Sequence, residues 1–183
     1  IQSIYDKGCR LIVTVDNGIS AVEEAAFAAS LGIDLIITDH HLPHESLPQA
    51  VAIVDPRRAD DHSPFKGLCG AGVAFKLCAA LEGCDPAELL EMYGELAALG
   101  TVADVMPLVG ENRTIVREGL SLLQDTMRPG LHALLESAGC SGKPVTADTV
   151  SYSLAPRLNA AGRMDNAAVA LKLLLCTDEA QAA

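Results

Sequence analysis

The chain has 183 residues, of which 24 are acidic and 13 basic, so its formal net charge is −11 at pH 7. This length fits one globular domain, and a composition that is 50% hydrophobic excludes an intrinsically disordered chain. Charged residues interrupt every apolar stretch before the ~18 residues that a transmembrane helix needs, so we expect no membrane partner. The acidic balance excludes nucleic-acid binding through bulk positive charge.

The first third of the chain alternates predicted strands with a predicted helix. Three short apolar runs are typical of strands buried on both faces: Leu11–Val15, Leu35–Thr38 and Val51–Val54. Between the first two, a helix is predicted over 20–31, where Ser20 and Glu23 form a capping box and Gly32 is the stop. Strand, helix and strand in this order predict a βαβ unit with parallel strands.

The rest of the chain has the periodicity of helices. One helix is predicted over 72–81, after a glycine-rich loop, and another begins with Asp85 as N-cap and Pro86 at its first position. Further apolar periodic stretches cover residues 115–123, 131–135 and 167–175, with Asn112 and Asp165 as caps of the first and last. The sequence therefore predicts an α/β fold, a parallel sheet flanked by helices, followed by a mostly helical C-terminal part.

Polar side chains with metal-binding chemistry follow the first two predicted strands. Asp16 comes directly after the first strand, and Asp39, His40 and His41 come directly after the second. Parallel neighbours bring these residues to the carboxyl edge of the sheet, where open α/β folds bind ligands. A mixture of carboxylates and imidazoles is typical of a Mn²⁺ or Mg²⁺ site rather than of a zinc site built from thiolates. An ordinary Asp-Asn-Gly turn and a solvated histidine pair explain the same residues, so spacing alone leaves both interpretations open.

The glycine-rich stretch Gly67–Gly72 allows two interpretations as well. It precedes a predicted helix, so its amides are suited to cradle a phosphate. Close packing of the helix on the sheet explains the same glycines, because a residue without a side chain permits close approach.

Four motifs resemble those of a known family. Thr38–His41 matches the signature of the DHH phosphoesterase superfamily, and two further segments resemble its preceding and following aspartate motifs: Val15–Ser20 and Gly100–Leu108. Pro156–Met164 is more specific and resembles the RecJ-like exonucleases of that superfamily. The resemblance covers essentially the whole chain and implies a DHH-type phosphoesterase core.

The resemblance also implies roles for individual residues. Metal ligands would be Asp16, which bridges two ions, with His40 and Asp104. Asp39 would complete or orient the cluster, and His41 would meet the scissile phosphate. Substrate phosphate would be held by a separate set of side chains: Asn159, Arg163 and Arg157. Two divalent cations, Mn²⁺ or Mg²⁺, would then act on a phosphodiester bond by a two-metal mechanism.

One departure from the family pattern affects the expected activity. Members of the superfamily carry an Asp-x-Asp motif upstream of the residue that Asp16 resembles, and no such motif precedes Asp16 here. We therefore expect a catalytic-core fragment that lacks N-terminal strand or strands, holds about half of the metal cluster and is inactive by itself. Residues 1–108 would be the phosphoesterase core, and residues 109–183 the helical remainder that leads to a second domain.

The function implied by the resemblance is 5′→3′ exonuclease action on single-stranded DNA, in DNA repair and recombination. Single-stranded DNA would be the substrate, with single-strand-binding protein and a helicase as partners by analogy. Six scattered cysteines without a C-x-x-C pair indicate reduced thiols and a cytoplasmic protein. Two alternatives stay open. The first is another enzyme of the same superfamily, either a phosphodiesterase for oligonucleotides or cyclic dinucleotides or a pyrophosphatase. The second is a non-catalytic scaffold with the DHH fold.

Overall fold

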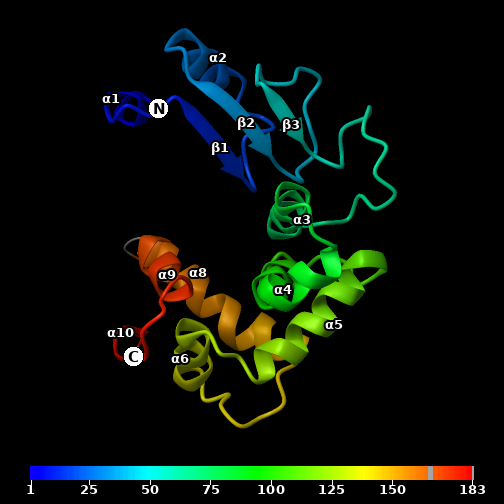
Figure 1. Ribbon diagram of the computed structural model, residues 1–183, viewed down its shortest axis with the longest axis vertical. Coiled ribbons are helices and arrows are strands. Elements are labelled where there is room, and N and C mark those ends of the chain that lie inside the picture. The colour runs from blue at the N-terminus through cyan, green and yellow to red at the C-terminus, as the bar shows by residue number, and fades with distance from the viewer. Residues whose placement is uncertain (165–166, 183) are drawn as a thin grey trace. The chain divides into compact units, whose positions relative to one another are not determined.

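The computed structural model describes the backbone of residues 1–164 and 167–182, and the side chains of 1–161 and 167–182. The chain forms two compact units, Ile1–Cys84 and Asp85–Ala183 (Figure 1). The first unit carries the sheet, and the second is helical. The expected order of an α/β part followed by a helical part is confirmed.

The sheet of the first unit has three parallel strands in the order β1-β2-β3, with arrowheads that point the same way in Figure 1. Their bounds are Leu11–Val15 for β1, Asp34–Thr38 for β2 and Ala52–Val54 for β3. Val15 is in register with Thr38, and Thr38 with Val54. The next residue of each strand therefore lies at the same carboxyl edge of the sheet, as the sequence predicts.

Three helices belong to this unit: α1 (Gln2–Asp6), α2 (Val22–Ser30) and α3 (Gly70–Glu82). Helix α2 packs on β2, where Ala25 shares a buried cluster with Leu35 and Ile37. The predicted capping box was wrong: the N-cap is Ala21, which makes no side-chain cap bond, so Ser20 lies outside the helix. The predicted stop at Gly32 is confirmed, because this glycine has φ +69°, in the left-handed region.

The two faces of the sheet differ in burial. Ile12, Leu35 and Ile37 point to the α2 side, whereas Leu11, Val13 and Val15 of β1 point to the other side and are 54%, 46% and 46% exposed. The prediction that this first strand is buried on both faces was wrong for the described residues. The apolar sequence is present, but the described part of the chain leaves this face uncovered.

The second unit is built from helices over its described residues. In chain order these are α4 (Pro86–Ala103), α5 (Gly110–Gln124), α6 (Pro129–Ser137), α7 (Ala147–Thr149), the π-helical turn η1 (Val150–Leu154), α8 (Ala155–Met164), α9 (Ala167–Leu174) and α10 (Glu179–Ala182). Asp85 caps α4 as predicted, since its side chain accepts a hydrogen bond from the Ala87 amide. Asn112 is not a cap: it lies inside α5, fully buried, and its side-chain amide donates to the Pro107 carbonyl. Asp165, the other predicted cap, lies outside the described residues.

Helices α4 and α5 cross at two glycines. A Cβ on Gly119 would lie 2.2 Å from the Gly94 carbonyl oxygen and 2.5 Å from the Ala98 Cβ. Only a residue without a side chain permits this approach. The crossing fixes one side of the core of this unit, to which α6, η1 and the start of α8 also contribute.

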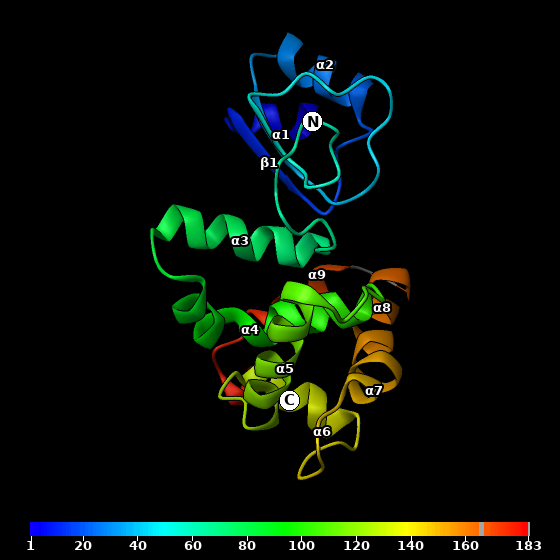
Figure 2. The same cartoon turned by 90° about the vertical axis from the view of Figure 1, so that its right-hand side faces the viewer.

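Figure 2 shows α7, η1 and α8 as one continuous helical stretch from residue 147 to residue 164. The periodic stretches in the sequence predict no helix over these residues. Pro156 lacks the amide hydrogen that an α-helix needs, and the wider π turn directly before it relaxes the regular bonding pattern at this point. Among the helices that the structure describes, none is both long and apolar enough to cross a membrane.

Candidate metal centre

Asp16 begins the turn that follows β1. Its amide donates to the Thr38 carbonyl oxygen at 3.0 Å, so it extends the parallel ladder by one residue. Its φ of 63° is in the left-handed region, which aspartate tolerates better than most residues. The turn is closed by the Thr14 hydroxyl, which donates to the Asn17 carbonyl at 2.8 Å. The side chain of Asp16 is exposed and is aimed along the edge of the sheet.

Asp39 is buried, and both of its carboxylate oxygens accept hydrogen bonds from backbone amides. Oδ2 accepts from the Ile19 amide at 3.0 Å, and Oδ1 accepts from the His40 amide at 2.8 Å and the His41 amide at 3.3 Å. Burial acts to raise the pKa of Asp39, but the bonds from Ile19, His41 and His40 outweigh it and hold the pKa below its ordinary value. Asp39 therefore stays ionised and orients the loop after β2.

His41 is held by the same carboxylate. Its Nδ1 lies 2.6 Å from Asp39 Oδ1. An ionised carboxylate only accepts hydrogen bonds, so Nδ1 carries the proton and Nε2 has the lone pair when the ring is neutral. The side chain of His41 is 59% exposed, and so it can reach a ligand.

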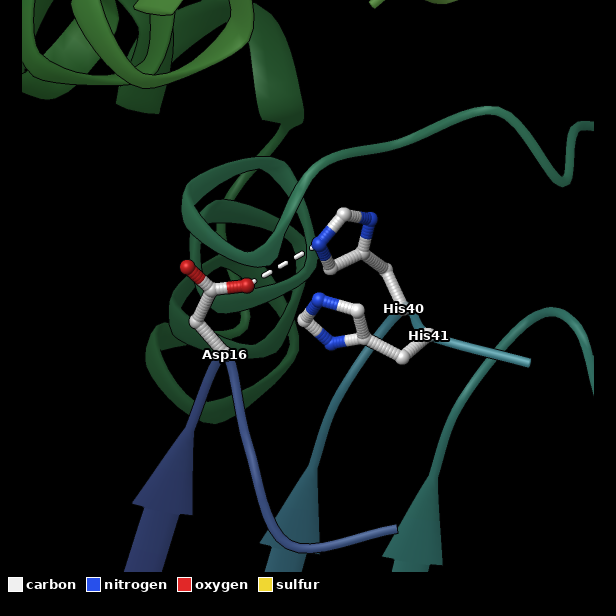
Figure 3. Close-up of side chains that lie close together, drawn as sticks. All are labelled: Asp16, His40 and His41. Carbon is white, nitrogen blue, oxygen red and sulfur yellow. Dashed lines mark ion pairs between the residues drawn. The ribbon is translucent and has the colours of Figure 1, made fainter. Parts of the chain in front are cut away.

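Asp16, His40 and His41 converge from the ends of β1 and β2 (Figure 3). One ligand atom from each lies within 4.8 Å of the other two, and His40 Nε2 is 3.0 Å from Asp16 Oδ1. One carboxylate and two imidazoles on a fixed edge fit a divalent cation such as Mn²⁺, which accepts oxygen and nitrogen ligands. Of the predicted metal ligands, the structure thus brings Asp16 and His40 together, and it adds His41 to them.

Gly70 makes room for this cluster. A Cβ on Gly70 would lie 2.3 Å from the Cβ, Cγ and Oδ1 atoms of Asp16. Helix α3 begins at Gly70, two residues before the predicted start, with the Cys69 thiol accepting from the Gly72 amide at 3.3 Å. The close approach at Gly70 supports the packing interpretation of the glycine-rich stretch, and the phosphate-binding interpretation stays a prediction.

Asp55 is a buried carboxylate that is not among the predicted site residues. It follows β3 as Asp16 and Asp39 follow β1 and β2, and it is only 2% exposed. Oδ1 accepts from the Arg57 amide at 2.8 Å. Burial raises the pKa of Asp55; the Arg57 amide lowers it, the charge of Asp39 raises it, and that of His40 lowers it. The signal in the sequence is a third aspartate in the same position, directly after the predicted strand Val51–Val54.

The other predicted site residues lie in the second unit. Asp104 is the exposed C-cap of α4, followed by Val105 with φ 55°. Asn159 and Arg157 are exposed on α8, where Arg157 donates to the Ser153 carbonyl at 2.7 Å. Arg163 belongs to α8, but its side chain lies outside the described residues. The roles of these four residues stay predictions.

Comparison with family models identifies the chain. The model of the DHH family, N-terminal domain, matches residues 2–101. The chain belongs to the DHH family. The DHH signature itself is Asp39, His40 and His41, which supply the loop-orienting carboxylate and two of the three converging side chains.

Curated relatives within the DHH family are named single-stranded-DNA-specific exonuclease RecJ. The chain is 49% identical over 181 residues to the protein of Bacillus subtilis (strain 168), covering 99% of this chain and 22% of the relative. It is 43% identical to the protein of Escherichia coli (strain K12), covering all of this chain and 34% of the relative. The chain thus spans between a fifth and about a third of the length of these relatives.

Solved structures agree with this family assignment. RecJ from Thermus thermophilus in complex with Mn²⁺ superposes with a TM-score of 0.83 at 38% identity, over 98% of this chain and 27% of that one. An exonuclease RecJ bound to manganese also gives a TM-score of 0.83, at 37% identity, over all of this chain and 46% of that one. The observed arrangement of a small parallel sheet with helices is therefore the fold of experimentally determined members of the family.

Proposed function

We propose that this chain is the catalytic core of a metal-dependent exonuclease that hydrolyses phosphodiester bonds of single-stranded DNA from the 5′ end. The observation that carries the proposal is the group Asp16, His40 and His41, whose ligand atoms lie within 4.8 Å of one another at the carboxyl edge of the sheet. The substrate class rests on the relatives named single-stranded-DNA-specific exonuclease, at 49% and 43% identity.

Mn²⁺ or Mg²⁺ is the proposed cofactor, held by Asp16 and His40, with Asp104 as the further ligand that the family resemblance implies. Bound divalent cations supply a nucleophile at neutral pH and neutralise charge on the phosphate. The chain's contribution is to fix the ligands. Asp16 is placed by its left-handed backbone and by the space at Gly70, and His40 by its burial at the end of β2.

Asp39 and His41 are the proposed catalytic pair. Asp39 remains ionised and keeps the proton of His41 on Nδ1, so His41 Nε2 is the atom directed at metal or substrate. A protonated His41 would donate from Nε2 to a phosphate oxygen and offset its negative charge. The exposed side chain of His41 suits contact with a phosphate, and the buried side chain of His40 suits metal binding.

Asn159, Arg163 and Arg157 are the proposed phosphate-binding residues. They share helix α8, where Asn159 and Arg163 are four positions apart and so lie on the same side of the helix. An arginine guanidinium offers forked donors that match phosphate oxygens, and the asparagine amide adds a neutral donor.

We further propose that residues 1–108 form the phosphoesterase core, that residues 109–183 are its helical remainder, and that the 183 residues alone are inactive. The half-exposed apolar face of β1 supports this, since Leu11, Val13 and Val15 are residues that a complete domain buries. The share of each relative that the chain covers, 22% and 34%, leaves room for other segments to cover this face and complete the site.

The proposed setting is DNA repair and recombination in the cytoplasm, with single-strand-binding protein and a helicase as partners. All six cysteines are described and are free thiols, which supports a reducing compartment. A phosphodiesterase for oligonucleotides or cyclic dinucleotides is the alternative that the same metal group would serve.

The test uses the protein as encoded, with whatever sequence flanks these residues in the gene. Single-stranded DNA labelled at either end is incubated with Mn²⁺ and with wild-type protein, H40A or H44A. His44 is an exposed histidine in the following loop and serves as the matched control. Release of mononucleotide from the 5′ label by wild type and H44A, but not by H40A, is expected. Turnover of dinucleotides alone would favour the phosphodiesterase, and no turnover of any substrate would favour the scaffold and overturn the proposal.

A further inference from the structure

Three aspartates lie side by side across the carboxyl edge of the sheet. Val15, Thr38 and Val54 are in register, and the residues that follow them are Asp16, Asp39 and Asp55. The Asp39 amide donates to the Val54 carbonyl at 3.0 Å, so the last two of the row are adjacent in the backbone ladder. The proposed function uses the first two of these aspartates and leaves Asp55 without a role.

Asp55 is buried more completely than its own contacts explain. Its Oδ1 accepts the Arg57 amide, but its Oδ2 has no solvent-accessible surface above 1 Å² and accepts no hydrogen bond from the described residues. A buried carboxylate oxygen without a donor is strongly unfavourable unless a positive charge lies close by. Asp39, by comparison, fills both of its oxygens.

A turn-forming role accounts for only half of the side chain. The bond from the Arg57 amide to Asp55 Oδ1 closes the turn after β3, and an asparagine would make the same bond through its own Oδ1. Nothing in that turn needs a second oxygen or a negative charge. The Oδ2 atom and the negative charge of Asp55 must therefore serve a contact outside the turn.

His40 is the neighbouring residue that would use a carboxylate oxygen and its negative charge. The charges of Asp39 and His40 both act on Asp55, and both ring nitrogens of His40 are shielded from solvent. A histidine that binds a cation through one ring nitrogen carries its proton on the other, and that proton needs an acceptor because solvent does not reach it. Nε2 of His40 faces Asp16 Oδ1 at 3.0 Å, so a cation bound between these two atoms would displace the proton from Nε2 and leave it on Nδ1.

We propose that Asp55 is a positioning residue of the metal centre. Its carboxylate accepts a hydrogen bond from Nδ1 of His40 when His40 Nε2 binds the cation. Its negative charge also balances part of the charge that the cation brings. The inference rests on the metal-binding role proposed above. It concerns the second layer of the centre, since Asp55 is too deeply buried to touch DNA. Carboxylates in this position typically change metal affinity by about 10–100-fold.

The experiment measures Mn²⁺ affinity by calorimetry, and urea unfolding without metal, on the protein as encoded. D55N keeps the turn bond and the volume but removes the charge, whereas D55A removes both. D60N is the matched control, because Asp60 lies in the next loop, is exposed, and loses the same charge. We expect D55N to bind Mn²⁺ about 10–100-fold more weakly than wild type. Its unfolding midpoint without metal should be unchanged or higher, and D60N should bind like wild type.

Two results would overturn the inference. One is wild-type Mn²⁺ affinity in D55N. The other is a loss of metal-free stability in D55N as large as in D55A, which would assign the charge to the fold itself. Both results leave the proposed function standing if H40A still abolishes Mn²⁺ binding and DNA digestion. Conversely, Mn²⁺ binding that weakens in D55N, in a protein that digests no DNA, would remove the exonuclease proposal and keep the inference.

Discussion

Replacing Gly70 with alanine is the most informative single change in the metal centre. The new Cβ would lie 2.3 Å from three atoms of Asp16, whereas ordinary van der Waals contact begins at 3.4 Å. Asp16 must therefore move by about 1 Å, the difference between these two distances. Gly70 is the first residue of helix α3, and alanine favours a helix by about 1 kcal/mol relative to glycine, so the substitution does not destabilise the helix itself.

The consequence falls on the ligand geometry. Asp16 Oδ1 is 3.0 Å from His40 Nε2, and a displacement of about 1 Å breaks the arrangement in which both reach one cation. Misplacement on this scale is worth on the order of 100-fold in a preorganised site. We expect G70A to weaken Mn²⁺ binding by 10–100-fold, roughly 1.4–2.7 kcal/mol, while the loss of folding stability stays within about 1–3 kcal/mol.

Calorimetric Mn²⁺ titration of the metal-free protein is the assay, with urea unfolding in parallel. The matched control is G72A, two residues along the same helix, where the atoms nearest to a Cβ belong to Leu68, at 3.2 Å, and Cys69. G72A should bind Mn²⁺ like wild type even if its stability changes. Wild-type affinity in G70A, or an equal loss in G72A, would refute the reasoning that Gly70 exists to admit the Asp16 carboxylate.

Three further predictions concern the stability of the fold. D39N should lose about 2–3 kcal/mol of unfolding free energy, because a buried carboxylate with charge-assisted bonds is replaced by an amide. Since the pKa of Asp39 is lowered from 3.8, the difference between wild type and D39N in urea unfolding should be full above about pH 4 and shrink as pH falls further; a difference that stays constant to pH 2 would contradict this. V105G should raise stability by roughly 0.5–1 kcal/mol, because Val105 has φ 55° and its side chain is 86% exposed, so glycine relieves strain without loss of packing; a lower urea midpoint would count against that view. G119A should lower stability by about 3 kcal/mol, because its Cβ would lie 2.2 Å from the Gly94 carbonyl oxygen, and a thermal melt like that of wild type would show that α4 and α5 separate freely.

The sheet and its functional edge were accessible from the sequence because the signals are local and strong. β-Branched runs mark the strands, and in a parallel sheet the residue after each strand must reach the same edge. That rule predicts from the sequence alone that Asp16 and His40 lie close together. The rule applied equally to Asp55, which went unnoticed because an aspartate before proline has an ordinary use in turns.

Features that depend on tertiary contacts were not accessible. Asn112 has the sequence properties of a helix cap, but it is buried and its amide satisfies the Pro107 carbonyl. Pro156 argues against a helix over 147–164, and only the π turn before it makes the continuous helical stretch possible. Gly70 belongs to a stretch that suits a phosphate loop as well as close packing, and only the position of Asp16 shows that a side chain at residue 70 would clash.

The measurement that tests the account most directly is an anomalous difference map from crystals of the protein as encoded, soaked in Mn²⁺. The account predicts a peak bounded by Asp16 and the two histidines that follow Asp39, at coordination distance from Asp16 Oδ1 and His40 Nε2. The same map from H40A crystals should lack the peak. A peak elsewhere on the chain, with none at the carboxyl edge of the sheet, would contradict the assignment of this edge as the metal centre.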